Sequence, residues 1–79
     1  MEPMRILIKP GGTSKEIQPY EGEEFGFVLR GSVKLYYGSE EYKVKKGECF
    51  YFKATRSHYL KNEGKCDTEI LWISSPPNF

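Results

Sequence analysis

The chain has a single histidine, His58, and only two cysteines, Cys49 and Cys66. With one histidine, no histidine pair can hold a metal, and no catalytic triad can form without His58. Two cysteines that lack a CxxC spacing are too few for a disulfide framework. We therefore expect two reduced thiols in a cytoplasmic protein.

The sequence also lacks long apolar runs and a large excess of charge of either sign. The sequence has no run of about 18 apolar residues, so no membrane span is predicted. It shows no charged leader before an apolar segment, so secretion is not indicated. Twelve basic and eleven acidic residues leave a formal net charge of +1. This balance does not favour a basic groove for nucleic acid. We expect this domain itself to bind neither nucleic acid nor a membrane.

Helical periodicity is absent from every window of a dozen residues, so no helix is expected. Short stretches rich in β-branched and aromatic residues alternate with glycine turns, which indicates an all-β antiparallel sandwich or closed barrel. The expected strands cover residues 5–9, 25–30, 33–37, 42–45, 49–53, 58–62 and 69–74.

The length of 79 residues predicts one domain over residues 1–79. A domain this small buries a modest fraction of its surface and is marginally stable alone. Oligomerisation is one common remedy, and the many aromatic side chains suit either a core or a dimer surface. A homodimer is therefore expected.

Two glycine-framed segments leave places for polar side chains that point inward. In the first, Gly12 and Gly31 enclose Gln18, Tyr20 and Glu24. Gln18 and Tyr20 lie two residues apart, so they share a face if that stretch is extended. Glu24 lies inside an expected strand, where a carboxylate needs a partner or a function because charged groups are rarely buried unpaired.

The second segment runs from Gly47 through His58 to Asn62. The spacing favours His58 as a pocket-lining group, although a lone histidine at the start of a strand can also be simply half-exposed. Asn62 is expected to be structural, because it leads into the turn at Gly64.

This two-part spacing resembles the signature of the cupin superfamily, small jelly-roll β-barrels that hold a metal ion or a small ligand at their centre. In that signature, histidines normally take the places of Gln18 and Tyr20, and a glutamate and a histidine take those of Glu24 and His58. The resemblance implies an antiparallel jelly-roll barrel in which these four side chains meet.

The strongest match is the string EGEEFGFVLRG at residues 21–31. It looks like a segment of cupin domains that follow a helix-turn-helix DNA-binding domain in bacterial transcriptional regulators. Residues 70–79, ILWISSPPNF, are similar to the tail of those regulators. No helix-turn-helix is present, so the resemblance implies an excised sensor half or a stand-alone bacterial or archaeal relative.

The departures from the signature bear on metal binding. Gln18 offers only an amide oxygen, and Tyr20 would have to lose the proton of a phenol whose ordinary pKa is about 10. Glu24 and His58 then remain, fewer than the three protein ligands of a typical catalytic metal. We expect no cofactor; if a divalent transition metal is bound, Glu24 and His58 hold it.

The resemblance therefore favours a non-enzymatic sensor. Such a domain would bind a small polar metabolite through Gln18, Tyr20, Glu24 and His58, which can all form hydrogen bonds, and would pass the signal through a dimer. No catalytic residue is assigned. A small metal-dependent enzyme of the isomerase or dioxygenase type, and a purely structural dimerisation barrel, are the alternatives.

Overall fold

The computed structural model describes residues 2–76, with side chains from residue 3 onward, and this part of the chain forms seven strands and no helix. Each expected strand is confirmed; the first differs most, since it begins at Glu2 rather than Arg5. Met1 and the last three residues of the regulator-like tail, 77–79, lie outside the described residues. The strands are β1 (Glu2–Ile8), β2 (Glu23–Arg30), β3 (Ser32–Tyr37), β4 (Glu40–Lys45), β5 (Cys49–Lys53), β6 (His58–Lys61) and β7 (Thr68–Ser75).

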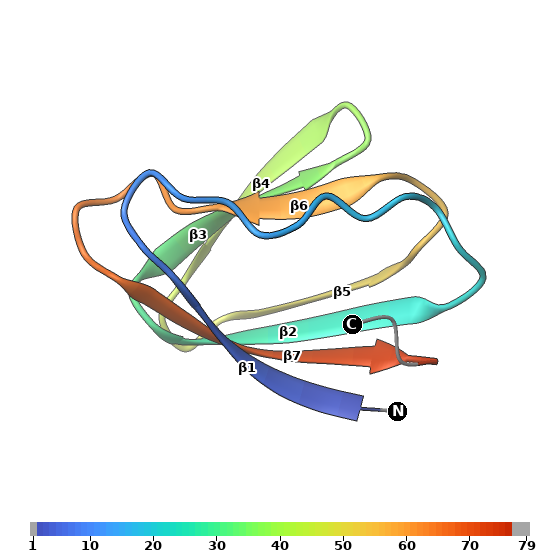
Figure 1. Cartoon of the computed structure of the whole chain (residues 1–79), viewed down its shortest axis with the longest axis horizontal. Coiled ribbons are helices and arrows are strands. Elements are labelled where there is room, and N and C mark those ends of the chain that lie inside the picture. The colour runs from blue at the N-terminus through green and yellow to red at the C-terminus, as the bar shows by residue number, and fades with distance from the viewer. Residues whose placement is uncertain (1, 77–79) are drawn as a thin grey trace.

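The strands form two sheets that face each other (Figure 1). One has four strands in the order β1-β7-β2-β5, and the other has three in the order β4-β3-β6. All strand pairs are antiparallel, which confirms the all-β jelly-roll prediction. The segment between β1 and β2 runs along β6 and pairs with it through two isolated bridges, Thr13 with Lys61 and Ile17 with His58.

Alternation along each strand decides which side chains enter the space between the sheets. In β7 every second residue is buried, from Thr68 to Ser74, and in β2 the buried residues are Glu24, Gly26 and Val28. The inward faces therefore carry an apolar core with polar groups at one end. The core residues are Ile8, Val28, Val33, Leu35, Val44, Phe50, Leu60, Ile70 and Trp72.

Gly26 makes room for an aromatic ring inside the barrel. A β-carbon at this position would collide with the ring of Phe50, which pairs with it across β2 and β5. Phe50 in turn packs edge-on to Trp72, with ring centroids 6.1 Å apart, and stacks on Phe52 at 6.0 Å. The middle of the barrel is therefore filled by aromatic side chains.

Asn62 is structural, as expected. It is fully buried, and its Nδ2 donates to the carbonyl oxygens of Ile8 at 2.9 Å and Cys66 at 2.8 Å. Its Oδ1 accepts from the backbone N–H of Gly64 at 2.9 Å. One side chain thus satisfies three backbone groups and joins the end of β1 to the turn that follows β6.

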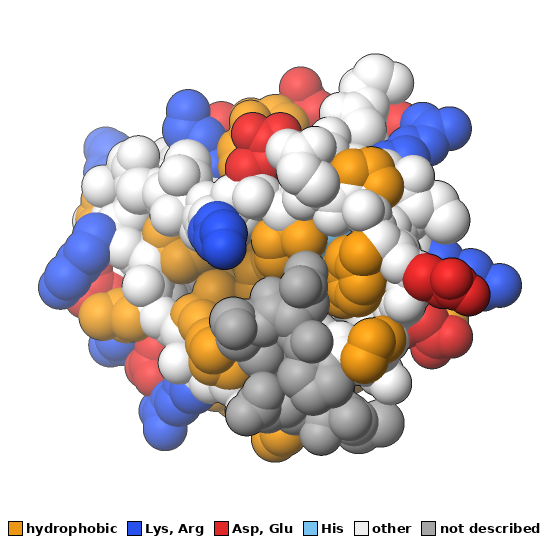
Figure 2. All heavy atoms as spheres, turned by 45° about the vertical axis from the view of Figure 1, so that its right-hand side comes forward, with side chains coloured by type: hydrophobic (Ala, Val, Ile, Leu, Met, Phe, Trp, Pro, Cys, Tyr) orange, Lys and Arg blue, Asp and Glu red, His pale blue; other side chains and the backbone are white. Residues whose placement is uncertain are grey.

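The surface view in Figure 2 shows basic and acidic side chains interspersed around the rim of one face, with hydrophobic side chains gathered nearer its centre. Neither sign of charge dominates this face, in keeping with the balanced composition. Among residues 2–76 there is no helix long and apolar enough to span a membrane.

The close fit of Gly26 against Phe50 predicts the effect of a methyl group. Gly26→Ala should lower the free energy of unfolding by about 1–3 kcal/mol, because overpacking forces the ring or the strand to move. In the double variant Gly26→Ala/Phe50→Leu the loss should be smaller than the sum of the single losses, because the smaller side chain relieves the collision. Urea denaturation measures all three variants, and strictly additive losses would contradict this packing.

Candidate functional site

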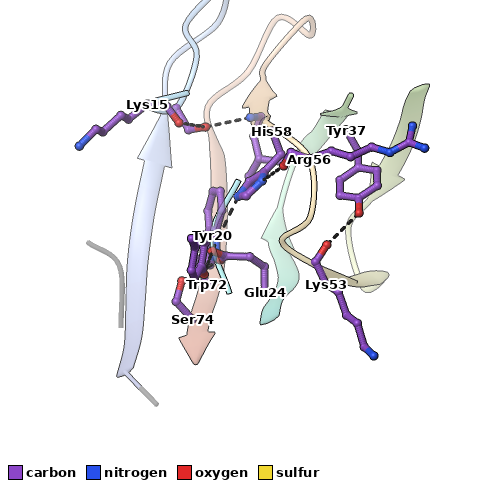
Figure 3. Close-up of polar contacts among 11 residues, drawn as sticks. Lys15, Tyr20, Glu24, Tyr37, Lys53, Arg56, His58, Trp72 and Ser74 are labelled. Carbon is purple, nitrogen blue, oxygen red and sulfur yellow. Dashed lines mark hydrogen bonds and ion pairs between the residues drawn. The ribbon is translucent and has the colours of Figure 1, made fainter. Parts of the chain in front are cut away.

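Glu24 lies at the centre of a buried polar cluster, shown in Figure 3. It comes from the inward face of β2 and is 1% exposed. Trp72 and Ser74 approach it from β7, the neighbouring strand, and His58 approaches from the first residue of β6 in the opposite sheet. Tyr20 reaches it from the segment that precedes β2. The cluster therefore spans both sheets of the barrel.

Both oxygens of the Glu24 carboxylate accept hydrogen bonds. Oε1 accepts from the indole Nε1–H of Trp72 and from the hydroxyl of Ser74, the latter at 2.7 Å. Oε2 accepts from the phenol O–H of Tyr20 and lies 3.7 Å from Nε2 of His58. A carboxylate has about four lone-pair sites, so this one is nearly saturated by groups of the same chain.

The His58 ring is oriented by the segment that precedes β6. Its Nδ1 lies 3.0 Å from the backbone carbonyl of Arg56, and a carbonyl can only accept, so Nδ1 carries a proton. Its Nε2 is buried, faces Glu24 and makes no hydrogen bond within the described residues. The ring packs edge-on against Phe52, with centroids 4.7 Å apart. The imidazole is thus held beside the carboxylate and shielded from solvent.

The cluster shifts the acidity of two of its members in opposite directions. Burial acts to raise the pKa of Glu24, but the adjacent His58 imidazole and the hydrogen bonds from Tyr20, Trp72 and Ser74 outweigh it and hold that pKa below its ordinary value. Burial and the hydrogen bond to Glu24 raise the pKa of Tyr20 to about 12. At neutral pH the cluster therefore holds an ionised carboxylate and a neutral phenol.

Gln18 does not join this cluster, contrary to the expected convergence of four side chains. Its side chain is exposed, whereas that of Ile17 is partly buried against the core. Ile17 exchanges two backbone hydrogen bonds with His58, which fixes its own side chain inward. The neighbouring side chain then points outward. Tyr20, Glu24 and His58 are brought together, and Gln18 is not.

Trp72 and Ser74 are the members that the sequence reasoning missed. Trp72 is one of the aromatic side chains expected in a core or at a dimer surface, and the sequence predicts no role for Ser74. Both lie on the same face of the expected strand as Ile70, because they follow it by two and four residues. This placement could have indicated a role for Ser74, because a serine on the buried face of a strand needs a hydrogen-bond partner. The register then supplies it, since Glu24 pairs with Ser74 across β2 and β7.

A hollow of about 360 Å³ lies at the mouth of the barrel beside Tyr20. Gly22 allows the rim of this hollow to pack closely, because a β-carbon there would collide with the Tyr20 ring and lie 2.8 Å from the carbonyl oxygen of Ser75. Tyr20 thus lines the hollow on one side and donates to buried Glu24 on the other. The lining residues are Tyr20, Glu21, Gly22, Glu23, Lys53, Thr55, Ser75 and Pro76.

The residues present do not fit a catalytic metal. Glu24 has both oxygens engaged by protein donors, and a metal would have to displace at least one of them. His58 is one further possible ligand, and within the described residues no three His, Cys, Asp or Glu side chains gather as a metal group. A catalytic zinc, for comparison, keeps three protein ligands and one open position.

A family model and a curated protein each match most of this chain. The cupin domain family model matches residues 4–74. A mannose-1-phosphate guanylyltransferase from Salmonella montevideo is 30% identical over 71 residues, which cover 90% of this chain. The chain spans only 15% of the length of that curated relative.

Two solved structures show the same fold at low identity. The Cupin_2 domain of an XRE family transcriptional regulator from Enterobacter cloacae has a TM-score of 0.84 at 19% identity, covering 96% of this chain and 81% of its own. A sugar phosphate isomerase from a cupin superfamily, from Silicibacter pomeroyi, has a TM-score of 0.79 at 22% identity, covering 91% of this chain and 48% of its own.

The lowered pKa of Glu24 predicts a specific dependence of stability on pH. A carboxylate with a depressed folded-state pKa contributes stability above its unfolded value of about 4.3, and this contribution is lost as the pH falls through the folded-state pKa. Glu24→Gln should be less stable at pH 7, because its amide N–H groups would face the donors Trp72 and Ser74. It should also lose less stability than the unsubstituted protein on acidification.

Urea denaturation at pH values from roughly 2 to 7, an interval that includes the titration of carboxyl groups, measures both effects. Glu21→Gln is the matched control, because Glu21 is exposed at the rim of the same hollow. It should follow the unsubstituted protein at each pH. Equal acid sensitivity of Glu24→Gln and the unsubstituted protein would show that the Glu24 hydrogen bonds do not set its acidity.

Proposed function

Since this chain belongs to the cupin domain family, whose model matches residues 4–74, we propose that it is a ligand-binding and dimerisation domain of a transcriptional regulator. The DNA-binding part of that regulator would lie outside these residues. The observation that carries the proposal is the Glu24 carboxylate, which is held by Tyr20, Trp72 and Ser74 rather than left open for a metal.

The regulator assignment draws on the breadth of one structural match. The cupin domain of the Enterobacter cloacae regulator corresponds to nearly all of this chain and most of its own length. The match supports a compact barrel of the kind attached to regulators. Two exposed free thiols, Cys49 and Cys66, suit the reducing cytoplasm where such regulators act.

The ligand is proposed to be a small polar metabolite bound in the hollow at the barrel mouth. The volume of about 360 Å³ lies in the range of small-molecule pockets, roughly 300–1,000 Å³. Its lining residues include Glu21, Glu23, Lys53 and Tyr20. Carboxylates accept and ammonium groups donate, so the hollow suits a molecule with hydroxyl or amino groups.

Tyr20 would connect the ligand to the barrel interior. Its hydroxyl donates to Glu24, which also receives hydrogen bonds from Trp72 and Ser74 of β7. A ligand that competes for this hydroxyl would change the hydrogen bonds of a buried carboxylate and would favour a different packing of β2 against β7. Such a ligand shifts the populations of the two arrangements by its differential affinity for them.

The enzyme alternative has weaker support. Solved structures with a similar fold include a sugar phosphate isomerase and a predicted oxalate decarboxylase, but this chain covers only 48% and 63% of them, against 81% of the regulator domain. A metal-dependent reaction here would have to proceed with Gln18 facing solvent and with Glu24 already engaged.

Ligand binding can be tested by thermal unfolding. Addition of the right compound from a panel of amino acids, polyamines and sugars should raise Tm progressively with concentration, because it binds only the folded state. At 100 times its Kd the stabilisation should approach ~2.7 kcal/mol. Tyr20→Phe should raise the apparent Kd of the ligand by at least about tenfold, as expected for loss of a hydrogen bond at a polar site. The rise in Tm at a given ligand concentration should therefore be smaller.

Tyr42→Phe is the matched control, because the Tyr42 hydroxyl also donates to a glutamate, Glu40, but on exposed β4. It should leave the ligand response unchanged. A response that survives Tyr20→Phe at full strength, or that Tyr42→Phe removes as well, would place the ligand elsewhere and overturn the assignment of the hollow.

A further inference from the structure

A second hollow, of about 430 Å³, lies at the end of the barrel opposite the mouth. Its lining includes Gly31 and Ser32, where β2 ends and β3 begins, whereas the hollow beside Tyr20 includes Glu23, the first residue of β2. The eight residues of β2 rise about 3.3 Å each, which puts roughly 26 Å between these two ends of the strand. The two hollows share no lining residue, so they are separate places on the molecule.

Lysine side chains line this second hollow from different directions, and we call it the lysine hollow. Lys43 and Lys45 come from the exposed face of β4, since buried Val44 between them faces the core. Lys46 follows in the turn toward β5, and Lys65 comes from the loop between β6 and β7. Within residues 3–76, no acidic side chain is part of the lining. The hollow therefore gathers four ammonium groups without a carboxylate among them.

The neighbouring carboxylates do not neutralise these lysines. Within the part of the chain that the structure describes, none of the four lysines forms an ion pair. The acidic residues that flank the hollow in the sequence already have partners. Glu63 lies 3.2 Å from Nζ of Lys34, and Asp67 lies 3.3 Å from Nζ of Lys9. Glu48 accepts from the last backbone N–H of β4 at 2.8 Å.

Hydrogen bonds hold the walls of the lysine hollow in place. Fully buried Asn62 fixes the loop that carries Lys65 through its hydrogen bonds to backbone groups. On the other side, the hydroxyl of Thr68 donates to the carbonyl of Ser32 at 2.7 Å, and Ser32 pairs with Lys45 across β3 and β4. Because the backbone beneath these lysines is already fixed, a bound anion would have to order only the side chains, which lowers the entropic cost of binding.

Protection of a sheet edge explains only part of this arrangement. Edge strands often carry lysines that prevent pairing with another sheet, and β4 is at the edge of its sheet. This role accounts for Lys43 and Lys45 but not for Lys46 and Lys65, which lie outside the strands. A concave surface lined by charge of one sign concentrates ions of the opposite sign, so the convergence of all four lysines favours a bound anion.

We propose that the lysine hollow binds a small polyphosphate, either free or as the phosphate tail of a nucleotide. Lysine binds phosphate groups as a point charge, and each phosphate ester carries a charge of about −1.5 to −2 at neutral pH. Two or three linked phosphates would therefore balance four ammonium groups in a small space. The volume of about 430 Å³ falls in the range of small-molecule pockets, roughly 300–1,000 Å³. The site does not depend on the ligand proposed for the barrel mouth.

Calorimetric titration with tripolyphosphate tests the site. The unsubstituted protein should bind one equivalent, with an affinity that falls several-fold from about 50 to about 200 mM salt, because exposed charges are screened. Lys65→Gln should raise the Kd about fivefold, and Lys45→Gln/Lys65→Gln at least about tenfold, through loss of charge-assisted hydrogen bonds. Lys15→Gln is the matched control, because Lys15 is exposed and lines neither hollow. It should leave the Kd unchanged.

Two further probes identify the source of the phosphate and test the charge density. If the natural ligand is a nucleotide, adenosine triphosphate should bind at least about tenfold more tightly than tripolyphosphate. If it is a free polyphosphate, the two should bind alike; either ranking retains the site. Citrate, whose carboxylates carry one charge each, should bind at least about tenfold more weakly than tripolyphosphate. Citrate that binds as tightly as tripolyphosphate would contradict a phosphate site.

Cys66 lines the lysine hollow and reports whether it is occupied. Its thiol is exposed, so iodoacetate should alkylate it in the free protein. Saturating tripolyphosphate should slow this reaction at least about fivefold, because it fills the hollow and cancels the positive field that attracts the anionic reagent. Cys49 lies on β5 of the other sheet, and its rate should not respond to tripolyphosphate. Mass spectrometry of peptides distinguishes the two thiols.

Three results would overturn the proposal. They are the absence of saturable binding up to about 1 mM tripolyphosphate, a Kd that Lys45→Gln/Lys65→Gln leaves unchanged, and stronger binding of an acidic peptide or a single-stranded oligonucleotide to the same lysines. The last would assign the surface to a macromolecule. Failure here is separable from failure at the barrel mouth, because Tyr20→Phe should leave tripolyphosphate binding intact while Lys45→Gln/Lys65→Gln leaves the metabolite response intact.

Discussion

The buried carboxylate of Glu24 is the constraint on which the rest of the structure depends. An ionised group with 1% of its surface exposed is tolerated only when hydrogen bonds replace the water that it has lost. Here the replacement comes from Tyr20, Trp72 and Ser74, with the imidazole of His58 3.7 Å away. These donors come from β7 and from the segment before β2, so satisfying one carboxylate fixes both relative to β2.

The packing next to this carboxylate explains why the centre of the barrel is filled. Gly26 allows Phe50 to fill the middle of the barrel, and the Phe50 ring contacts both Trp72 and Phe52. Gly22 lets the Tyr20 ring and the carbonyl of Ser75 approach the backbone closely at the rim. Both glycines, one in β2 and one just before it, thus make room for an aromatic ring.

Strand positions and strand parity could be predicted from the sequence, because burial repeats every second residue and glycines mark the turns. The inward placement of Glu24 and His58 was implied by the cupin-like spacing, and both side chains are buried. Gln18 was wrongly placed, because it precedes β2 in a segment that pairs only through single bridges, where no continuous alternation applies. The roles of Trp72 and Ser74 depend on which strand lies beside β2, and that long-range pairing is not encoded in local pattern.

The central claim is that the donors around Glu24 occupy the place that a metal ion would need. Titration of the purified protein with Co²⁺, whose visible absorption reports direct ligation, tests it most directly. The account predicts no new absorption band and no stoichiometric uptake at neutral pH. One equivalent of tightly bound Co²⁺, with a ligand-field band that disappears in both Glu24→Gln and His58→Ala, would contradict it.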